Sequence, residues 1–355
     1  MNREERVHAL VQLGHFISGW LQGEEGGKFS FNADLYDGFS KSVARAVREN
    51  SWFTERSVRD ALASIADKML QTDRLNSWLS SYSYNTEAER QKPVGIVAAG
   101  NIPLVCFHDI MCVLLAGYNV LIKPSSKDRM LVSACVALLH FIDPRLSRYI
   151  NVAGSFTEEH ISKLIATGSG NTARYIEYEY RNVVRLVRKN RSSVAILTGE
   201  ETECELKLLA SDIFSYFGMG CRNVSKLYVP AGYEFEMLMN VSGCWRADYE
   251  DNAKLMSRYR YEKAVADTLG IGYVDGGFFI LSRNTAFCSP PAVVNVDFFT
   301  NLDVIKYQLI GNIDQLQCVV SAPALFGNVG FGKTQQPELT DYADGVDTIS
   351  WLLNS

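Results

Sequence analysis

The chain has 355 residues, of which 47% are hydrophobic and 21% are charged, an ordinary composition for a folded globular protein. At roughly 100–200 residues per domain, this length predicts about two domains. The 35 basic and 40 acidic residues leave a formal charge of −5, so no positive field favours a nucleic-acid partner. The eight cysteines are scattered without a CxxC pair, so we expect neither a disulfide scaffold nor a bound metal.

Two segments indicate whether the protein is secreted or inserted in a membrane. The N-terminal segment MNREERVHALVQLGHF has the spacing of an amphipathic helix rather than the layout of a secretion signal, which predicts a cytoplasmic protein. Residues 93–122 are almost free of charge, and a membrane-spanning helix needs about 20 consecutive apolar residues. Asn101, Pro103 and Asp109 interrupt this stretch, so we expect a strand, a buried helix and a second strand, without a membrane span.

The predicted elements begin with helices and continue as alternating strands and helices. Apolar residues recur at helical spacing before residue 90. From Pro93 onward, short apolar runs bounded by Gly and Pro indicate buried strands, with helices between them, the first opened by Pro103. The expected strands are residues 94–99, 119–123, 149–152, 164–167, 183–187, 194–197, 225–229, 278–281, 293–298 and 317–320.

This order predicts an α/β protein with a doubly wound parallel sheet, because strands alternate with helices. We expect a first domain at residues 1–198, which includes the helical N-terminal region, and a second, smaller domain at residues 199–355. No Pro- or Ser-rich linker marks the boundary, so its position rests on the strand pattern alone.

One candidate phosphate-binding turn follows the predicted strand at 164–167. Residues 168–173 match G-x-G-x-x-A between a strand and a helix, and backbone N–H groups at such a helix start favour a pyrophosphate. The acidic residue that usually follows about 20 positions later is missing. The pattern therefore indicates either a nucleotide site or a plain strand–helix turn.

A second candidate, residues 327–334, matches the G-x-x-x-x-G-K-T phosphate loop of ATPases and GTPases. The context disfavours that function, because no strand is expected to run into the loop. Pro337 follows Thr334 closely, where a helix should continue. A nucleoside triphosphatase is kept as an alternative.

Cys221 is the candidate nucleophile. Gly218 and Gly220 precede it between a predicted helix and a predicted strand, so bare backbone gives a substrate room to approach. Neighbouring N–H groups could hold an oxyanion, and Arg222 could favour the thiolate. The alternative is an inert cysteine, which is the interpretation we give to nearly all the others.

Two further segments follow predicted strands, at the carboxyl edge where such sheets bind ligands. Asn101 follows the first strand, where it could also be a helix N-cap. Lys123 ends the next strand and is followed by Ser125 and Ser126, a group that suits a ribose or phosphate or forms an ordinary turn.

Taken together and in order, these segments resemble the aldehyde dehydrogenase superfamily. PVGIVAAGNIPL resembles its strand ending in an asparagine, and LAGYNVLIKPSS resembles its "AAGN…KPSE" segment. IATGSGNT is similar to its "F-TGS" turn, and FGMGCRNVSKLYV to its "F-x-x-GQ-x-C" nucleophile segment. Within the superfamily, GNIPL, KNRSSVAIL and DYADGVDT are most similar to the LuxC-type acyl-CoA reductases.

The resemblance implies an aldehyde dehydrogenase-like fold, in which residues 1–198 contain the NAD(P)-binding domain and residues 199–355 a smaller α/β catalytic domain. It implies that Cys221 is the nucleophile and that the Asn101 amide and the Cys221 backbone N–H form the oxyanion hole. The residues expected to bind the cofactor are Lys123, Ser125 and Ser126 at the adenosine ribose, and Thr167, Gly168, Ser169 and Gly170 beneath the pyrophosphate.

Departures from the superfamily pattern refine the expected chemistry. The water-activating glutamate of "ELGGK" has no counterpart in residues 187–191, and the late "E-x-F-G-P" glutamate has none around residues 289–291. Without a base, water is a poor acceptor, whereas a thiol with a pKa of about 8.5 needs less help. The tryptophan that usually precedes the asparagine is Gly100, which predicts more room near the site.

Cofactor choice is suggested by the end of the "KPSE" segment. Its glutamate, which holds the ribose 2′-hydroxyl, is replaced by Ser126, with Lys127 beside it. Loss of an acid and gain of a base should admit a 2′-phosphate, which predicts NADPH and leaves NADH as the alternative.

The sequence therefore predicts NAD(P)H-dependent reduction of an acyl thioester to an aldehyde through a cysteinyl acyl-enzyme. The acyl donor is expected to be acyl-CoA or an acyl carrier, and the resemblance allows a homodimer. A different class of function, a non-catalytic relative that binds nucleotide as a partner subunit, is motivated by the short chain and the lost carboxylates.

Overall fold

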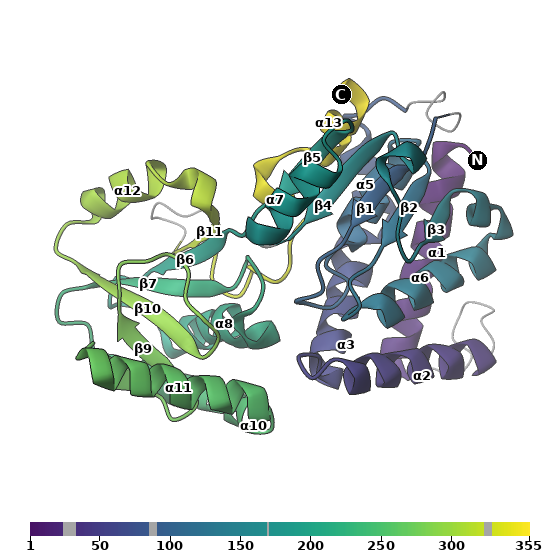
Figure 1. Ribbon diagram of the computed structural model, residues 1–355. Helices are drawn as coiled ribbons and strands as arrows, with labels where there is room; N and C mark the ends of the chain where they lie inside the picture. The colour runs from purple at the N-terminus through teal and green to yellow at the C-terminus, as the bar shows by residue number, and fades with distance from the viewer. Residues whose placement is uncertain (24–32, 85–90, 169, 323–328) are drawn as a thin grey trace. The chain divides into compact units, whose positions relative to one another are not determined.

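The computed structural model describes the chain except residues 24–32, 85–90, 169 and 323–328. The chain forms two compact units (Figure 1), which are described separately. Unit 1 consists of Met1–Lys189 together with Pro337–Ser355, and unit 2 of Asn190–Gln336. The chain therefore passes between the units twice, after Lys189 and after Gln336.

Unit 1 is built on a five-stranded parallel sheet with the order β3-β2-β1-β4-β5. Val94 pairs with Val120 on one side and Lys163 on the other, so the strand order reverses beside β1. Such a reversal is the topological switch point at which α/β sheets bind ligands. The strands are β1 (Val94–Val97), β2 (Val120–Lys123), β3 (Ile150–Val152), β4 (Lys163–Thr167) and β5 (Val184–Arg188).

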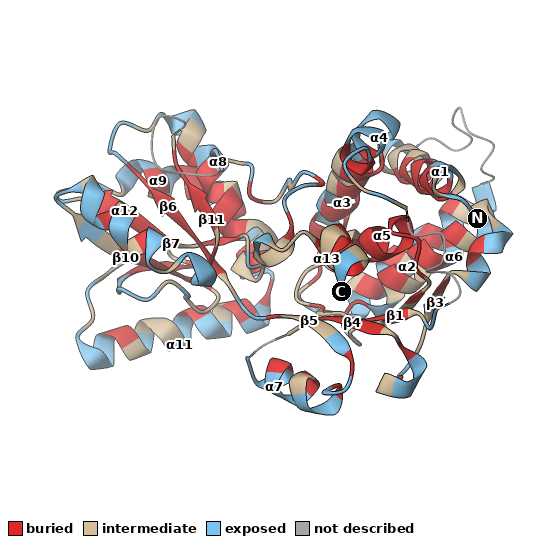
Figure 2. Cartoon of the chain, turned by 90° about the horizontal axis from the view of Figure 1, so that it is seen from above, coloured by how far each residue is buried: buried red, intermediate tan, exposed pale blue. Residues whose placement is uncertain are grey.

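Both faces of this sheet are covered, which explains why the central strands β1 and β4 are short, largely apolar runs. Side chains alternate, so Ile96 faces one hydrophobic cluster and Val97 the other. Figure 2 shows α7 on one face and α5, α6 and α13 on the opposite face, followed by the N-terminal helices. These helices are α1 (Arg3–Gln22), α2 (Ala33–Glu49), α3 (Glu55–Ser64), α4 (Thr72–Leu79), α5 (Phe107–Leu115), α6 (Arg129–Ile142), α7 (Gly170–Glu179) and α13 (Thr348–Asn354).

Local sequence fixes the N-terminal helix and its attachment. Asn2 and Glu5 form a capping box at the start of α1, and Gly23 ends it with a left-handed φ of 73°. Arg6 is fully buried and donates to the carbonyl oxygens of Leu114 (2.8 Å) and Tyr118 (3.1 Å). The guanidinium thereby ties α1 to the end of α5 and to the turn that follows it.

The segment from Pro337 onward completes unit 1. Ile349 and Leu352 lie in its core, and Trp78 Nε1 donates to the Tyr342 hydroxyl at 2.8 Å. Lys163 Nζ donates to the Leu352 carbonyl oxygen at 2.5 Å. This returning segment is therefore part of the packed unit rather than a loose extension.

A buried ion pair joins three separate segments of unit 1. Arg188 Nη1 contacts both carboxylate oxygens of Asp109, at 2.6 Å and 2.5 Å, and Nη2 donates to Thr348 Oγ1 at 2.8 Å. Both charged side chains are only 5% exposed. The pair connects the end of β5, helix α5 and the start of α13.

Unit 2 contains a six-stranded sheet with the order β11-β6-β7-β10-β9-β8, parallel except for β8. Helix α12 packs on it through Ile305 and Leu309 against Val194, Ile196 and Tyr228. The strands are β6 (Ser192–Ile196), β7 (Val224–Pro230), β8 (Tyr273–Asp275), β9 (Ile280–Arg283), β10 (Val293–Phe299) and β11 (Leu316–Val320). The helices are α8 (Glu203–Phe214), α9 (Glu236–Ser242), α10 (Arg246–Glu250), α11 (Ala253–Leu269) and α12 (Leu302–Ile310).

The expected α/β class is confirmed, and the structure differs from the sequence expectations at four places. The units divide after Lys189 rather than at residue 198, because β6 pairs with β7, and residues 337–355 return to unit 1 instead of staying with 199–355. The helix expected from Pro103 starts at Phe107, since the intervening residues form turns. The short strand β8 was not expected. Within the described residues, no helix is long and apolar enough to cross a membrane.

Replacing Arg188 should destabilise unit 1 strongly. Arg188→Met leaves the Asp109 carboxylate buried without its counter-charge, which should cost about 3–5 kcal/mol. The measurement is the urea midpoint followed by tryptophan fluorescence, which reports mainly unit 1 because four of the five tryptophans lie there. The double variant Asp109→Leu, Arg188→Met should be less destabilised than Arg188→Met. Equal losses in both would contradict this account.

Candidate active site

The predicted catalytic residue Asn101 and the predicted cofactor residues Lys123 and Thr167 lie at the carboxyl edge of the sheet of unit 1, around the switch point. Asn101 lies in the loop after β1, Lys123 ends β2 and Thr167 ends β4. Because these three strands are neighbours, their ends share one edge. Ser169 lies outside the described residues. Helix α5 begins at Phe107, so Asn101 is not its N-cap.

Gly100 brings the first two of these loops into contact. A Cβ atom at Gly100 would lie 2.5 Å from Ser125 Oγ and 2.6 Å from Ser125 Cβ. The expected extra room at this glycine is therefore wrong, because Ser125 occupies the space that a side chain would need. Glycine is required here so that the Asn101 loop can lie directly against the turn after β2.

A buried carboxyl group holds the same two loops together. Asp128 is 1% exposed, and its Oδ2 accepts the Leu104 backbone N–H at 2.8 Å. Leu104 has a left-handed φ of 54°, an unfavourable conformation for a branched residue. Asp128 Oδ1 is buried without a hydrogen-bond partner among the described residues, and burial raises the pKa of Asp128 well above its ordinary value. Burial therefore favours the neutral acid.

The turn after β4 suits the phosphate-binding interpretation. A Cβ atom at Gly168 would lie 2.7 Å from Thr172 Cγ2, so only glycine lets the chain pass this close to the first turn of α7. Helix α7 starts at Gly170, and its N-terminal N–H groups provide the positive end that a pyrophosphate requires. Together with Lys123, these features fit a dinucleotide cofactor.

In unit 2, a strained turn leads into Cys221. Tyr216, Phe217 and Gly218 have successive left-handed φ values of 53°, 56° and 70° between α8 and the cysteine. Each non-glycine residue in this region costs about 1 kcal/mol or more, and such strain clusters at functional sites. The Cys221 residue itself is exposed.

Side chains on either side of the loop fix its backbone. Asn223 Nδ2 donates to the carbonyl oxygens of Asp212 (3.1 Å) and Ser215 (2.8 Å), while its Oδ1 accepts the Gly220 N–H at 2.8 Å. Ser193 Oγ donates to the Cys221 carbonyl oxygen at 2.9 Å. The loop is therefore pre-organised although its thiol-bearing residue is exposed.

The other cysteines lie in different settings. Burial raises the pKa values of the Cys106 and Cys112 thiols well above normal and that of Cys135 to about 12, which keeps them protonated. The remaining cysteines are Cys318, which is buried, and the exposed Cys204, Cys244 and Cys288. Cys204 and Cys288 have no adjoining glycine, and Cys244, which follows Gly243, lies in a short 3-10 helix (Gly243–Trp245) rather than in a loop.

The phosphate-loop pattern at residues 327–334 is not supported as a nucleotide site. Thr334 is fully buried, and its hydroxyl donates to Asp212 Oδ1 at 2.8 Å. The following residues form turns rather than a helix. Gly327 and Asn328 lie outside the described residues. A hydroxyl engaged by a buried carboxylate is not placed to bind the metal of a nucleoside triphosphate.

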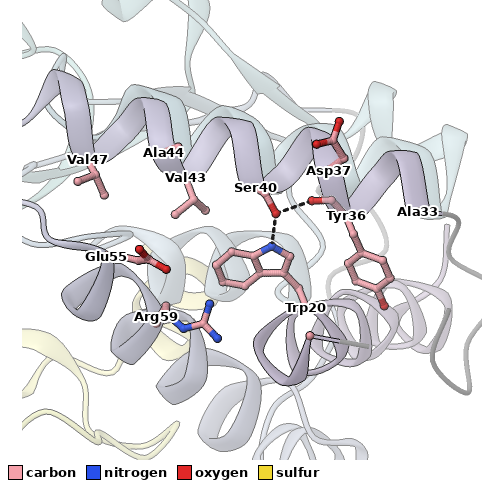
Figure 3. A pocket seen from close by; sticks show the side chains of 11 residues that line it. Trp20, Ala33, Tyr36, Asp37, Ser40, Val43, Ala44, Val47, Glu55 and Arg59 are labelled. Atoms are coloured by element: carbon pink, nitrogen blue, oxygen red, sulfur yellow. Dashed lines mark hydrogen bonds between the residues drawn. The ribbon is translucent and has the colours of Figure 1, made fainter. Parts of the chain in front are cut away.

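A cavity of about 610 Å³ lies among the N-terminal helices of unit 1 (Figure 3). Trp20 Nε1 donates to Ser40 Oγ at 2.8 Å, and the Arg59 guanidinium lies 4.9 Å from the Trp20 ring centre. No predicted site residue lines this cavity. In the part of the chain that the structure describes, no group of three metal-ligating side chains gathers.

The two sheets and their helices form an aldehyde dehydrogenase fold. One similar solved structure is an NAD-dependent aldehyde dehydrogenase from Sinorhizobium meliloti, with a TM-score of 0.66 at 11% identity over 94% of this chain and 72% of that chain. HpcC from Thermus thermophilus has a TM-score of 0.64 at 14% identity over 92% and 71%. The NAD+ complex of an aldehyde dehydrogenase from Bacillus cereus has a TM-score of 0.57 at 14% identity over 92% and 73%.

The sequence model of the acyl-CoA reductase (LuxC) family matches residues 13–232, more than half of the chain. The chain therefore belongs to the LuxC acyl-CoA reductase family, and it is an oxidoreductase that acts on acyl-CoA and aldehyde groups. The matched region contains Asn101, Cys221 and every predicted cofactor residue. The superfamily and branch predicted from the sequence are confirmed. No curated protein matches the sequence significantly.

Sequence reasoning missed Asp128. Its position shortly after Ser126 and directly before a helix is that of an ordinary cap, yet its side chain makes no capping bond. Its partner Leu104 lies 24 residues earlier in the chain. The available signal was an acidic residue beside an otherwise apolar helix start, which is too common a pattern to single out a site residue.

Asp128→Asn should stabilise the protein increasingly as pH rises. Because the folded pKa of Asp128 is raised, its contribution to stability is greatest below the unfolded value of about 3.9 and is lost as pH rises toward the folded value. An amide cannot ionise, so the melting-temperature difference between variant and wild type should grow from pH 5 to pH 8.

Asp143→Asn is the matched control. Arg145 lowers the Asp143 pKa, so that carboxylate is ionised in both states across this range and its difference should stay flat. A flat difference for Asp128→Asn as well would show that Asp128 is ionised in the folded protein.

Proposed function

We propose that the protein reduces an acyl thioester to an aldehyde with NADPH, through an acyl-enzyme on Cys221. The observation that carries this proposal is the exposed Cys221 in a strained, glycine-flanked and hydrogen-bonded loop. The Cys221 thiolate attacks the acyl-CoA carbonyl, and coenzyme A leaves as its thiolate. When bound, the nicotinamide cofactor supplies a hydride to the acyl carbonyl. The resulting thiohemiacetal oxyanion collapses to release the aldehyde and regenerate the Cys221 thiolate.

Stabilisation of the oxyanion is assigned to Asn101 and the Cys221 backbone N–H. Both tetrahedral species carry negative charge on the former carbonyl oxygen, and donors aimed at that position lower the barrier. Support comes from how firmly each loop is held within its own unit. The close contact at Gly100 and the Asp128 hydrogen bond fix the Asn101 loop, and Asn223 fixes the Cys221 loop.

The acyl-enzyme is proposed to exchange its acyl group with a thiol rather than to lose it to water. Residues 187–191 contain no acidic side chain, and Arg188 in this segment is bound to Asp109. The Asp109 carboxylate is fully engaged by the guanidinium and is not placed to activate water. A thiolate such as that of coenzyme A needs no comparable base, so acyl transfer to and from a thioester is favoured over hydrolysis.

Cys221→Ala should lower acyl-CoA-dependent NADPH oxidation by about a thousandfold or more, because it removes the thiol on which the proposed acyl-enzyme forms. The assay follows NADPH absorbance with a long-chain acyl-CoA. Cys244→Ala, an exposed cysteine outside the loop, is the matched control and should keep wild-type activity.

Iodoacetamide labelling distinguishes the proposed catalytic function from the alternative of a non-catalytic, nucleotide-binding partner subunit. The proposed function requires that Cys221 react much faster than Cys244. Full activity in Cys221→Ala, or equal inertness of all eight cysteines, would overturn the nucleophile assignment and favour a nucleotide-binding partner subunit.

NADPH is proposed over NADH because of the residues after β2. Ser126 and Lys127 are both exposed at the end of this turn, and neither repels a 2′-phosphate. Ser126→Glu supplies a carboxylate that can accept a ribose 2′-hydroxyl and repel a phosphate. The ratio of kcat/KM for NADH to that for NADPH should rise about tenfold or more. Ser126→Gln has the same length without charge and should change the ratio much less. A wild-type preference for NADH would contradict the proposal.

A further inference from the structure

Asp212 is a buried carboxylate at the end of α8, close in sequence to the Cys221 loop. It is 1% exposed and accepts the backbone N–H groups of Gly332 (2.7 Å) and Thr334 (3.1 Å) and the Thr334 hydroxyl (2.8 Å). Asp212 accepts three hydrogen bonds, and Thr334 is itself fully buried. This is therefore an interior contact of unit 2 and not a chance surface interaction.

The contact continues to the residue beside the nucleophile. Arg222 Nε donates to the Thr334 carbonyl oxygen at 2.5 Å, and Arg222 directly follows Cys221. The order of contacts is therefore Asp212, Thr334, Arg222 and then Cys221. On the opposite side of the cysteine, Gly220 is held by Asn223, so both neighbours of Cys221 are fixed.

The same contact explains why the end of the segment 327–334 matches a phosphate-loop pattern although the structure does not support a nucleotide site there. Gly332 has a left-handed φ of 75°, and a Cβ atom there would lie 2.7 Å from Leu208 Cδ2, so glycine is required. Thr334 is required for its hydroxyl. Lys333 between them is exposed, whereas a true phosphate loop would depend on it.

We propose that Asp212 and Thr334 are positioning residues for the nucleophile: they fix Arg222, which directly follows Cys221, and through it the backbone at Cys221 and the position of the Arg222 charge. This inference rests on the proposed function of Cys221. A guanidinium held beside a thiol favours the thiolate, and a fixed loop keeps the attacking sulfur aligned. Both side chains are buried, so neither is placed to touch a substrate.

The Asp212–Thr334 contact should respond to acid. Burial raises the pKa of Asp212 to about 6, opposed by the hydrogen bonds from Gly332 and Thr334 and by the nearby charge of Arg222. Among the segments that pack against Asp212, the one that contains Arg222 contributes a charged side chain, and its positive charge lowers the pKa of the Asp212 carboxyl. Protonation of Asp212 adds an O–H donor to a carboxyl group that three other donors already surround. The Asp212–Thr334 contact should therefore weaken below about pH 6.

The test is the rate at which iodoacetamide alkylates Cys221, measured by mass spectrometry without substrate. Thr334→Val keeps the shape and removes the hydroxyl, and the rate should fall about tenfold, as for loss of a hydrogen bond to a charged group. Thr334→Ser should restore it. Lys333→Ala is the matched control and should react like wild type. In the reductase assay, Thr334→Val should lower kcat and leave KM for NADPH unchanged.

A second measurement covers the case in which Thr334→Val folds poorly. The ratio of wild-type to Asp212→Asn alkylation rates removes the pH dependence that the two proteins share, and it should be large at pH 8 and fall toward one below about pH 6. A wild-type rate in Thr334→Val, a slow rate in Lys333→Ala or a ratio independent of pH would overturn the inference. If alkylation follows these expectations while wild type lacks reductase activity, the positioning role stands and the proposed function falls.

Discussion

The first unit depends on the buried pairing of Arg188 with Asp109, supported by Thr348. These residues come from a strand end, a helix and the returning segment, and each would be unstable in this interior without the others. The pairing anchors the end of the edge strand β5, next to Lys189, where the chain leaves unit 1. The loops of Asn101 and Lys123 lie at the carboxyl edge of the same sheet, so they rest on a unit whose interior is held by a charge cluster that the proposed chemistry does not use.

The sequence was informative where local pattern and tertiary role coincide. Parallel strands buried on both faces must be apolar runs, so the strands at 94–97 and 120–123 could be recognised without a structure. The unit boundary could not, because β6 is equally apolar whichever sheet it joins. The start of α5 was also misplaced, since the left-handed φ of Leu104 is imposed by Asp128 rather than by its neighbours in sequence.

The candidate site shows the same division. Glycines beside Cys221 reveal an open approach in the sequence itself, and so does the asparagine after a buried strand. The carboxyl groups of Asp128 and Asp212 give no such signal, because their partners lie 24 and about 120 residues away. Thr334 is the opposite case: the sequence gives a clear signal, but the signal is misleading. It lies in a phosphate-loop pattern, yet its hydroxyl donates to the buried Asp212 carboxylate.

The double passage of the chain between the units has a consequence for biosynthesis. Unit 2 is one continuous segment, so it can fold as soon as it leaves the ribosome. Unit 1 is assembled from two separated pieces and lacks Ile349 and Leu352 from its core until the returning segment has been synthesised. During translation, the unit that carries Cys221 can therefore be complete while unit 1 still lacks part of its core.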